Sequence, residues 1–133
     1  MKKCHLSLSI TQWIGVRLPL PITCEFSYSA RDPFAVTLIF DAEGEWPVRW
    51  VFSRELLAEG LTARAGDGDV VLWPEFGPDG GCALWVQVGR TCTAHFEIPA
   101  KPVMQWLAAT YVMVTRGQEI AEVEWGDLTQ LID

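Results

Sequence analysis

The sequence has few basic residues, no stretch long enough to cross a membrane and no common catalytic motif. Ten Lys and Arg residues stand against seventeen Asp and Glu, which gives the 133-residue chain a net charge of −7 at pH 7. Nucleic acids and anionic lipid surfaces attract basic proteins, so this charge argues against unspecific binding to either. A bilayer-spanning helix needs about 20 consecutive, mostly apolar residues. The sequence contains no such run, and we expect no direct membrane insertion.

The start of the chain does not have the composition of an export signal. Met1-Lys2-Lys3 resembles the basic beginning of one, but polar residues follow where an apolar core is required, and no small-residue cleavage site comes after them. We therefore expect a cytoplasmic protein. The four cysteines form no C-x-x-C pair, which disfavours zinc and thioredoxin-like sites. In a reducing compartment we expect them to be buried free thiols: Cys4, Cys24, Cys82 and Cys92.

Residues that could carry catalysis are scattered. His5 and His95 are the only candidates for a base at neutral pH, and Cys92 lies on the opposite face of an ideal strand from His95. Asp67-Gly68-Asp69 resembles part of a calcium loop without its bidentate Glu and flanking helices, so an acidic turn is favoured. Glycine-rich phosphate loops and the G-x-S-x-G motif are missing. We expect no enzymatic activity, no cofactor and no bound metal.

The pattern that is present is an alternation of apolar and polar residues, which is typical of half-buried strands. The composition, half apolar and one fifth charged, fits one folded domain over residues 1–133. Short turns such as Asp41–Glu45, Pro78–Gly81 and a two-residue Gly89-Arg90 turn predict antiparallel neighbours. The seven predicted strands are His5–Thr11, Ile22–Tyr28, Phe34–Phe40, Trp46–Phe52, Asp69–Trp73, Cys82–Val88 and Cys92–Ile98.

Two helices are predicted, with a last helical turn over 127–132. Ser53 is an N-cap candidate for the first helix, and Gly60 fits the left-handed position just past its end. The second helix starts after Pro99-Ala100 and ends at Arg116-Gly117. Its apolar residues cover more than one stripe, so the helix must be buried on several sides, which another subunit could provide. The residues predicted at such an interface are Met104, Trp106, Tyr111 and Met113.

Seven tryptophans are many for so short a chain. Trp50 lies in an alternating strand and is expected in the core. Trp73, Pro74 and Phe76 leave a strand and enter a segment rich in Pro and Gly. Exposed Trp and Phe are typical interface anchors, so these three are candidates for partner binding, with a satellite core as the equal alternative.

Three segments resemble the SsgA-like proteins, a small family of sporulating actinobacteria. Asp32–Val36 is similar to the family's D-P-[YF]-A-V, and Val48–Leu61 is close to its W-x-F-x-R-x-L-L-x-x-G-L. Gly66–Pro74 is like its G-x-G-D-V-x-x-W-P, and the resemblance extends over most of the chain. Residues 11–20 and 75–95 depart from the family pattern.

The resemblance implies an α+β domain. It combines a mostly antiparallel sheet of about seven strands, or a partly open barrel, with two or three flanking helices. The implied architecture is similar to the whirly-type nucleic-acid binders and assembles as a trimer. The implied function is non-enzymatic: such proteins control where septa form during sporulation. One member recruits the tubulin-like division protein FtsZ to the septum, together with a second SsgA-like protein.

Two points stay open at the level of the sequence. Arg54 has no partner in the local pattern, and it either pairs with an acidic neighbour or contacts a binding partner. A single-stranded nucleic-acid-binding module is the alternative function, suggested by fold analogy alone, and the scattered basic residues argue against it.

Overall fold

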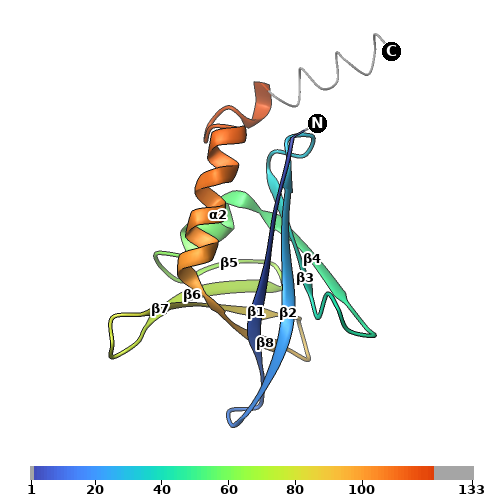
Figure 1. The fold of residues 1–133 in the computed structure, drawn as a ribbon, viewed down its shortest axis with the longest axis vertical. Helices are drawn as coiled ribbons and strands as arrows, with labels where there is room; N and C mark the ends of the chain where they lie inside the picture. The colour runs from blue at the N-terminus through green and yellow to red at the C-terminus, as the bar shows by residue number, and fades with distance from the viewer. Residues whose placement is uncertain (1, 122–133) are drawn as a thin grey trace.

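The computed structural model describes residues 2–121, which form one eight-stranded antiparallel sheet and the helices α1 and α2, with residues 119–121 also helical (Figure 1). The strand order is β4-β3-β2-β1-β8-β7-β6-β5. The elements are β1 Lys3–Ile14, β2 Leu18–Ser29, β3 Ala35–Phe40, β4 Val48–Ser53, α1 Arg54–Gly60, β5 Ala65–Asp67, β6 Val70–Phe76, β7 Cys82–Val88, β8 Ala94–Pro99 and α2 Ala100–Met113.

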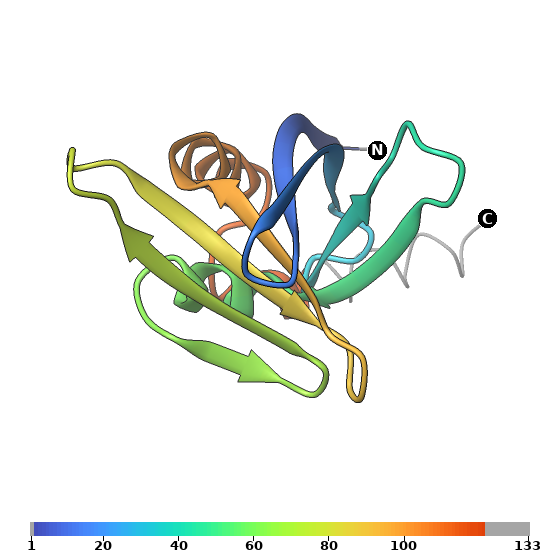
Figure 2. The same cartoon turned by 90° about the horizontal axis from the view of Figure 1, so that it is seen from below.

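The sheet consists of two four-stranded meanders, each followed by a helix. Strands β1 to β4 lead into α1, and strands β5 to β8 lead into α2. The two meanders are joined by strand pairing only where residues 11–13 of β1 pair with residues 95–97 of β8. Figures 1 and 2 show the two halves crossing steeply, so that the sheet curves into a partly open barrel, as expected. Both helices lie on the same, concave side of the sheet.

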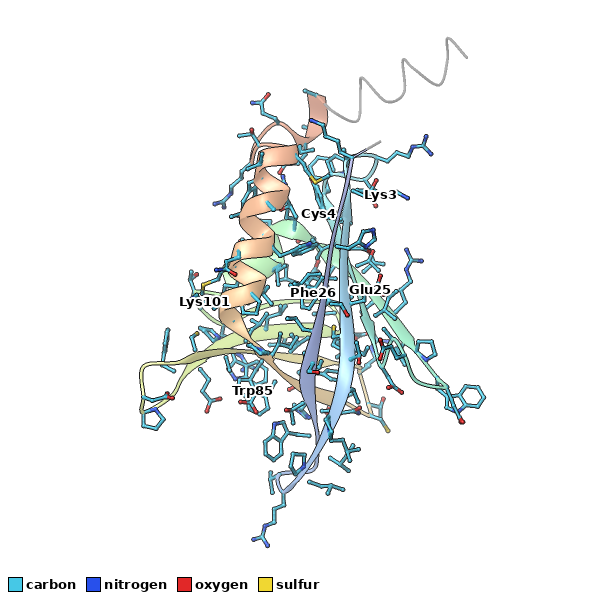
Figure 3. The ribbon with its side chains drawn as sticks, viewed as in Figure 1. Lys3, Cys4, Glu25, Phe26, Trp85 and Lys101 are labelled. Atoms are coloured by element: carbon cyan, nitrogen blue, oxygen red, sulfur yellow. The ribbon has the colours of Figure 1, made fainter. Side chains whose placement is uncertain are left out.

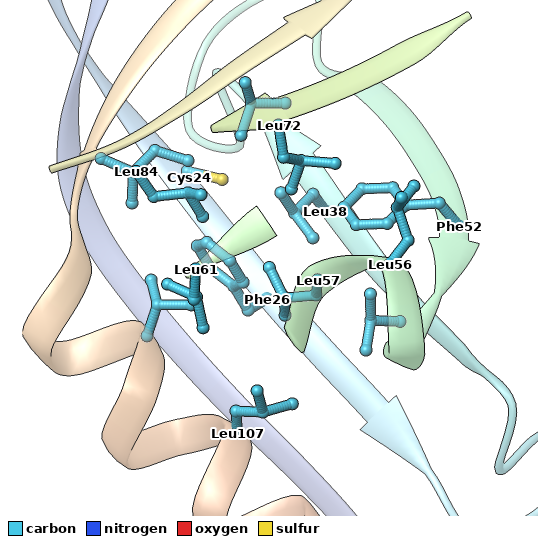
Figure 4. Close-up of a cluster of buried hydrophobic side chains, with 14 of the residues drawn as sticks. Cys24, Phe26, Leu38, Phe52, Leu56, Leu57, Leu61, Leu72, Leu84 and Leu107 are labelled. Carbon is cyan, nitrogen blue, oxygen red and sulfur yellow. The ribbon is translucent and has the colours of Figure 1, made fainter. Parts of the chain in front are cut away.

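The core lies between the sheet and the helices, and period-two alternation supplies most of it. In β2, for example, Cys24, Phe26 and Tyr28 are buried while the residues between them are only partly so. Figure 4 shows Phe26 and Leu38 of the sheet facing residues of α1, with Leu107 of α2 nearby. Trp50 packs against this core from β4. The alternation predicted for the strand over residues 22–28 is therefore confirmed.

All seven predicted strands are present, and three details differ. Strand β5 was missed because Gly66 and Asp67 are poor strand formers and its register depends on β6 alone. The turn predicted at Gly89-Arg90 is wrong: Val88 pairs with Ala94, so five residues connect β7 to β8. Cys92 lies exposed in this connection, and Cys4 and Cys82 are only partly buried. Of the four cysteines expected to be buried free thiols, all are free but only Cys24 is buried. The helical turn predicted for 127–132 lies outside the described residues.

The first helix begins as predicted but ends differently. Ser53 caps it, because its side chain accepts a hydrogen bond from the Leu56 backbone N–H at 2.9 Å. Gly60, however, is the last helical residue and does not have a positive φ. The glycine is needed there for space: a Cβ on it would lie 2.5 Å from the Cβ of Leu72 on β6. Gly60 therefore permits the close approach of α1 to the second meander.

Replacing Gly60 by alanine should destabilise the protein, although the same change in an open helix is favourable. The added Cβ meets a Cβ that no rotamer change can move, and such overpacking costs about 1–3 kcal/mol. Gly66→Ala is the matched control, since its Cβ would have contacts of 3.5 Å or more. Urea unfolding followed by tryptophan fluorescence measures both. A Gly60→Ala protein as stable as the wild type would contradict this account of the packing.

Candidate functional site

Three indoles form a stacked row on the face of the sheet opposite the helices. Trp73 of β6 lies directly across from Trp85 of β7, with ring centroids 6.2 Å apart and planes within 6°. Trp13 of β1 continues the stack at 6.3 Å from Trp85, and the Arg64 guanidinium lies 5.1 Å from the Trp73 ring. Figure 3 shows Trp85 on the side of the strands away from α2. We call Trp13, Trp73 and Trp85 the tryptophan row.

Polar neighbours hold this row in place. The Trp13 Nε1–H donates to Glu97 Oε1 at 2.9 Å, and Glu97 stands opposite Trp85 on β8. His95 stands opposite Trp13, and its Nε2 is 3.1 Å from the Gln87 side-chain oxygen. All three indoles are only partly buried. Because the rings are fixed by stacking and by a hydrogen bond, little conformational freedom remains to be lost when a partner covers them.

A trough of about 500 Å³ adjoins the row. Residues 9–11 of β1, the turn after β6 and Trp85 are part of its lining. Three carboxylates line it, those of Glu75, Asp79 and Glu97, while its lining includes no Lys or Arg. Phe76 stands at its side with 73% of its surface exposed. We call this the acidic trough; it suits a partner segment that is apolar and positively charged.

The end of the β1–β2 hairpin extends the same surface. It projects from the sheet in Figure 1 and lies in front in Figure 2, where the molecule is seen from below. Four aliphatic side chains are 40% or more exposed there: Ile14, Val16, Leu18 and Leu20. Val16 also lines a groove of about 460 Å³ with Trp13 and Trp85, which joins the hairpin to the row. We call residues 14–20 the hairpin tip.

Row, trough and tip together make one continuous surface, which is apolar at the row and the tip and acidic in the trough. Trp85 lines both the trough and the groove beside the tip, so the three parts are not separate patches. Contiguous apolar surface of this kind on a soluble domain marks an interaction site. Of the predicted partner-binding residues, Trp73 lies in the row and Phe76 at the trough, while Pro74 is half-buried between them. No finding tests their role in binding.

Arg54 is not part of this surface, which corrects the prediction that it contacts a partner. Its side chain is 2% exposed and forms an ion pair with Glu119 at 3.0 Å. It also donates to the backbone oxygens of Thr110 at 3.1 Å and Val114 at 2.8 Å, which satisfies carbonyl groups at the end of α2. The acidic neighbour proposed as its other option is therefore Glu119.

Two tyrosine rings enclose the same guanidinium. Its Cζ atom is 4.9 Å from the centre of the Tyr28 ring and 4.5 Å from that of Tyr111. A second ion pair, between Glu55 and Arg116, lies nearby at the surface. Helix α1 is thereby tied to the end of α2 by two neighbouring residues. Arg54 is a structural residue, and its place in the sequence motif is explained by folding alone.

The environment of Glu119 makes this tie sensitive to acid. Partial burial by itself raises the pKa of the carboxyl group, but hydrogen bonds from backbone N–H groups and from Arg54 outweigh it and lower the pKa. Because the pKa of Glu119 is lowered in the folded protein, its carboxylate stabilises the folded state at pH values above the ordinary pKa of 4.5. This stabilisation is lost as the pH falls through the lowered pKa.

The wild type should therefore lose more stability on acidification than Glu119→Gln does. The gap in unfolding free energy between the two proteins should narrow as the pH drops from 7 towards about 3, because the glutamine cannot take up the proton. Glu59→Gln, at an exposed position of α1, should follow the wild type. If the unfolding free energies of the wild type and Glu119→Gln changed in parallel with pH, the Glu119 carboxylate would not contribute to the acid sensitivity.

The residues predicted at an oligomer interface divide into two groups. Trp106 is 4% exposed and packs edge-on against Phe26 with centroids 5.5 Å apart, so it belongs to the subunit's own core, which corrects that prediction. Met104 is 42% exposed on α2, and Tyr111 and Met113 are half-buried. The Tyr111 hydroxyl is buried and has no hydrogen-bond partner within residues 2–121. An interface role for Met104, Tyr111 and Met113 stays a prediction.

Groups with metal or thiol chemistry do not gather at one place in the described part of the chain. Within residues 2–121, no three His, Cys, Asp or Glu side chains lie close enough to share a metal ion. The buried thiol of Cys24 has its pKa raised to about 12, by burial first and by the charge of Glu25 second. None of the helices in this range is long and apolar enough to cross a membrane.

Sequence reasoning missed Trp13, Trp85 and the hairpin tip. The outward position of Trp85 could have been predicted from the sequence, because Trp85 alternates with the apolar residues Leu84 and Val86, which are buried. The stacking of the row could not have been predicted from the sequence, since it depends on the pairing of β6 with β7 and of β8 with β1.

Comparison with known proteins identifies the family of this chain. The family described as "Streptomyces sporulation and cell division protein, SsgA" matches residues 22–119. The chain belongs to the SsgA family. The resemblance seen in the sequence is thus confirmed, and the hairpin tip lies just before the matched region.

Relatives within the SsgA family cover most of this chain. The sporulation-specific cell division protein SsgB of Salinispora tropica is 38% identical over 107 residues, covering 79% of this chain and 75% of its own length. SsgB of Streptomyces coelicolor is 34% identical over 116 residues, which cover 87% of this chain and 83% of its own length. These names support a role in cell division during sporulation.

Solved structures agree with the fold. An SsgA-like sporulation-specific cell division protein from Thermobifida fusca superposes with a TM-score of 0.91 at 26% identity, covering 99% of this chain and 96% of its own. A structure from a study of SsgB in longitudinal cell division during sporulation of Streptomyces coelicolor superposes with a TM-score of 0.83 at 30% identity. The match covers 91% of this chain and 95% of that structure's chain.

Proposed function

We propose that the protein is a non-enzymatic regulator of sporulation-specific cell division that positions septa through protein contacts. It acts in the cytoplasm at the division septum, where it recruits FtsZ together with a second SsgA-like protein. The observation that carries the proposal is family membership over residues 22–119, with relatives named as sporulation-specific cell division proteins. The surface of row, trough and tip supports it, because contact surface is what an adaptor requires.

Self-association is part of the proposal, and we propose a trimer. An exposed two-stranded tip with four aliphatic side chains is an unfavourable surface for a lone subunit. The solvent face of α2 adds Met104 and Val112, the latter 85% exposed. Both surfaces suit contacts with copies of the same chain or with division proteins.

Single-stranded nucleic acid is the alternative that the tryptophan row itself favours, because bases stack on such rings. The surroundings of the row favour it less. Arg64 stands at one end of the row, but Glu75, Asp79 and Glu97 line the adjoining trough, and the chain carries a net charge of −7. Phosphate groups would be repelled there. We expect no salt-dependent binding of oligonucleotides at micromolar protein concentration.

The direct test is co-sedimentation of the purified protein with FtsZ polymers from the same organism. We expect the protein to enter the pellet only when FtsZ polymerises, alone or with the second SsgA-like protein present. An unrelated acidic protein of similar size controls for trapping. Absence from the pellet in both mixtures would overturn FtsZ recruitment, while division defects in a deletion strain would separately test the broader role in sporulation.

A further inference from the structure

We propose that the hairpin tip of one copy of this protein docks in the acidic trough of a second copy, in a head-to-tail contact. The inference rests on the self-association proposed above and names the surfaces that make it.

The tip lacks support within its own subunit. Strand β1 pairs with β8 only through residues 11–13, and β2 pairs with β3 only through residues 24–27. Beyond these points the end of the hairpin is a two-stranded ribbon. Leu18, Pro19 and Leu20 pair with residues 12–14 of β1, and in the described structure they have no strand on their other side. Two-stranded hairpins are marginal in water when nothing packs against them. Apolar side chains kept on such a ribbon are explained if another molecule covers them.

The chemistry of the tip matches that of the trough. The tip carries a single charged residue, Arg17, which is exposed and makes no ion pair within residues 2–121. The trough offers three carboxylates and no basic residue, and Trp85, Phe76 and Pro78 supply apolar walls. A segment that presents one cation among aliphatic side chains fits this lining in both charge and polarity.

Two prolines prepare the tip for docking. Pro19 and Pro21 pair opposite Trp13 and Thr11, and their fixed φ angles stiffen the ribbon. A stiff segment loses less conformational entropy on binding than a flexible loop would. The rigid row beside the trough has the same advantage on the receiving side.

The contact has a defined symmetry. Tip and trough adjoin on one face of the chain, and in the proposed head-to-tail contact each copy gives its tip to one neighbour and receives the tip of another in its trough. Such heterologous contacts close into rings when the rotation between copies allows it. A trimer, as proposed above, is the ring of three that this contact would build.

Charge reversal in the full-length protein tests the contact. Arg17→Glu puts a carboxylate into an acidic trough, and Glu75→Lys with Asp79→Lys puts two cations opposite Arg17. Each change should weaken self-association by about tenfold or more, measured by sedimentation equilibrium at low salt. The protein with all three substitutions should recover most of the wild-type association, because the charges are then exchanged rather than lost.

Arg31→Glu is the matched control, since Arg31 is exposed in the turn after β2, at the other end of the hairpin. It should associate like the wild type. The contact is overturned if Arg17→Glu associates normally, or if the triple variant is no better than its parents while the wild type forms oligomers. A wild type that stays at 14.9 kDa at every concentration would overturn self-association itself and this contact with it. FtsZ co-sedimentation would still decide recruitment separately.

Discussion

Replacing Arg54 by alanine is expected to lower the free energy of unfolding by about 3–5 kcal/mol, the usual cost of removing one member of a buried ion pair. The substitution leaves the Glu119 carboxylate without its cation and frees two carbonyl groups at the end of α2. It also empties the space between the Tyr28 and Tyr111 rings. The total free energy of unfolding of a domain of this size is about 5–15 kcal/mol, so the variant should be close to unfolding.

Arg116→Ala is the matched control for this prediction. Arg116 also bridges α1 to the segment after α2, through Glu55, but both side chains are largely exposed. Removing an exposed pair costs about 1 kcal/mol or less. Urea or thermal unfolding of the two variants gives the comparison directly. If both variants lost the same small amount of unfolding free energy, the buried guanidinium of Arg54 would not be what holds the helices together.

Replacing Trp85 by serine is expected to weaken partner binding by about 30-fold or more, because a buried interface tryptophan contributes about 2 kcal/mol or more. Trp85 is the centre of the surface: it stacks on both other indoles of the row and lines both the trough and the groove beside the tip. The buried residues on either side of it face the core, so the fold should remain. Co-sedimentation with FtsZ polymers measures the loss.

Trp46→Ser serves as control for Trp85→Ser. Trp46 is 81% exposed in the loop between β3 and β4, away from the row, trough and tip. It tests whether loss of any exposed indole reduces binding. Unfolding curves and circular dichroism should show that both variants are folded. Equal binding by Trp85→Ser and the wild type would remove the tryptophan row from the account of partner contact.

The strands were predictable because their burial alternates with a period of two. Cys24, Phe26 and Tyr28 had to share one face, and they do. The start of α1 followed from Ser53 in the same local way. Gly60 shows the limit of such rules: its local pattern indicated a left-handed cap, but its role depends on Leu72, which a different meander brings against it.

The functional surface was only partly predictable for the same reason. The proline- and glycine-rich surroundings of Phe76 made it a candidate for an exposed contact residue, with a satellite core as the equal alternative, and the residue is exposed. The row could not be predicted in this way, because it needs residues from β1, β6 and β7 in one register. Trp106 was misplaced and the choice between the two options for Arg54 stayed open, because their sequence neighbours do not reveal burial. Arg54 is buried by contacts with residues 56 to 65 positions away, and Trp106 by a ring on β2.

The most direct measurement counts sporulation septa in a deletion strain that carries the wild type, Trp46→Ser or Trp85→Ser at equal expression. If the protein positions septa through the surface centred on Trp85, the wild type and Trp46→Ser restore regular septation, and Trp85→Ser does not. Full restoration by a folded Trp85→Ser protein would contradict the account.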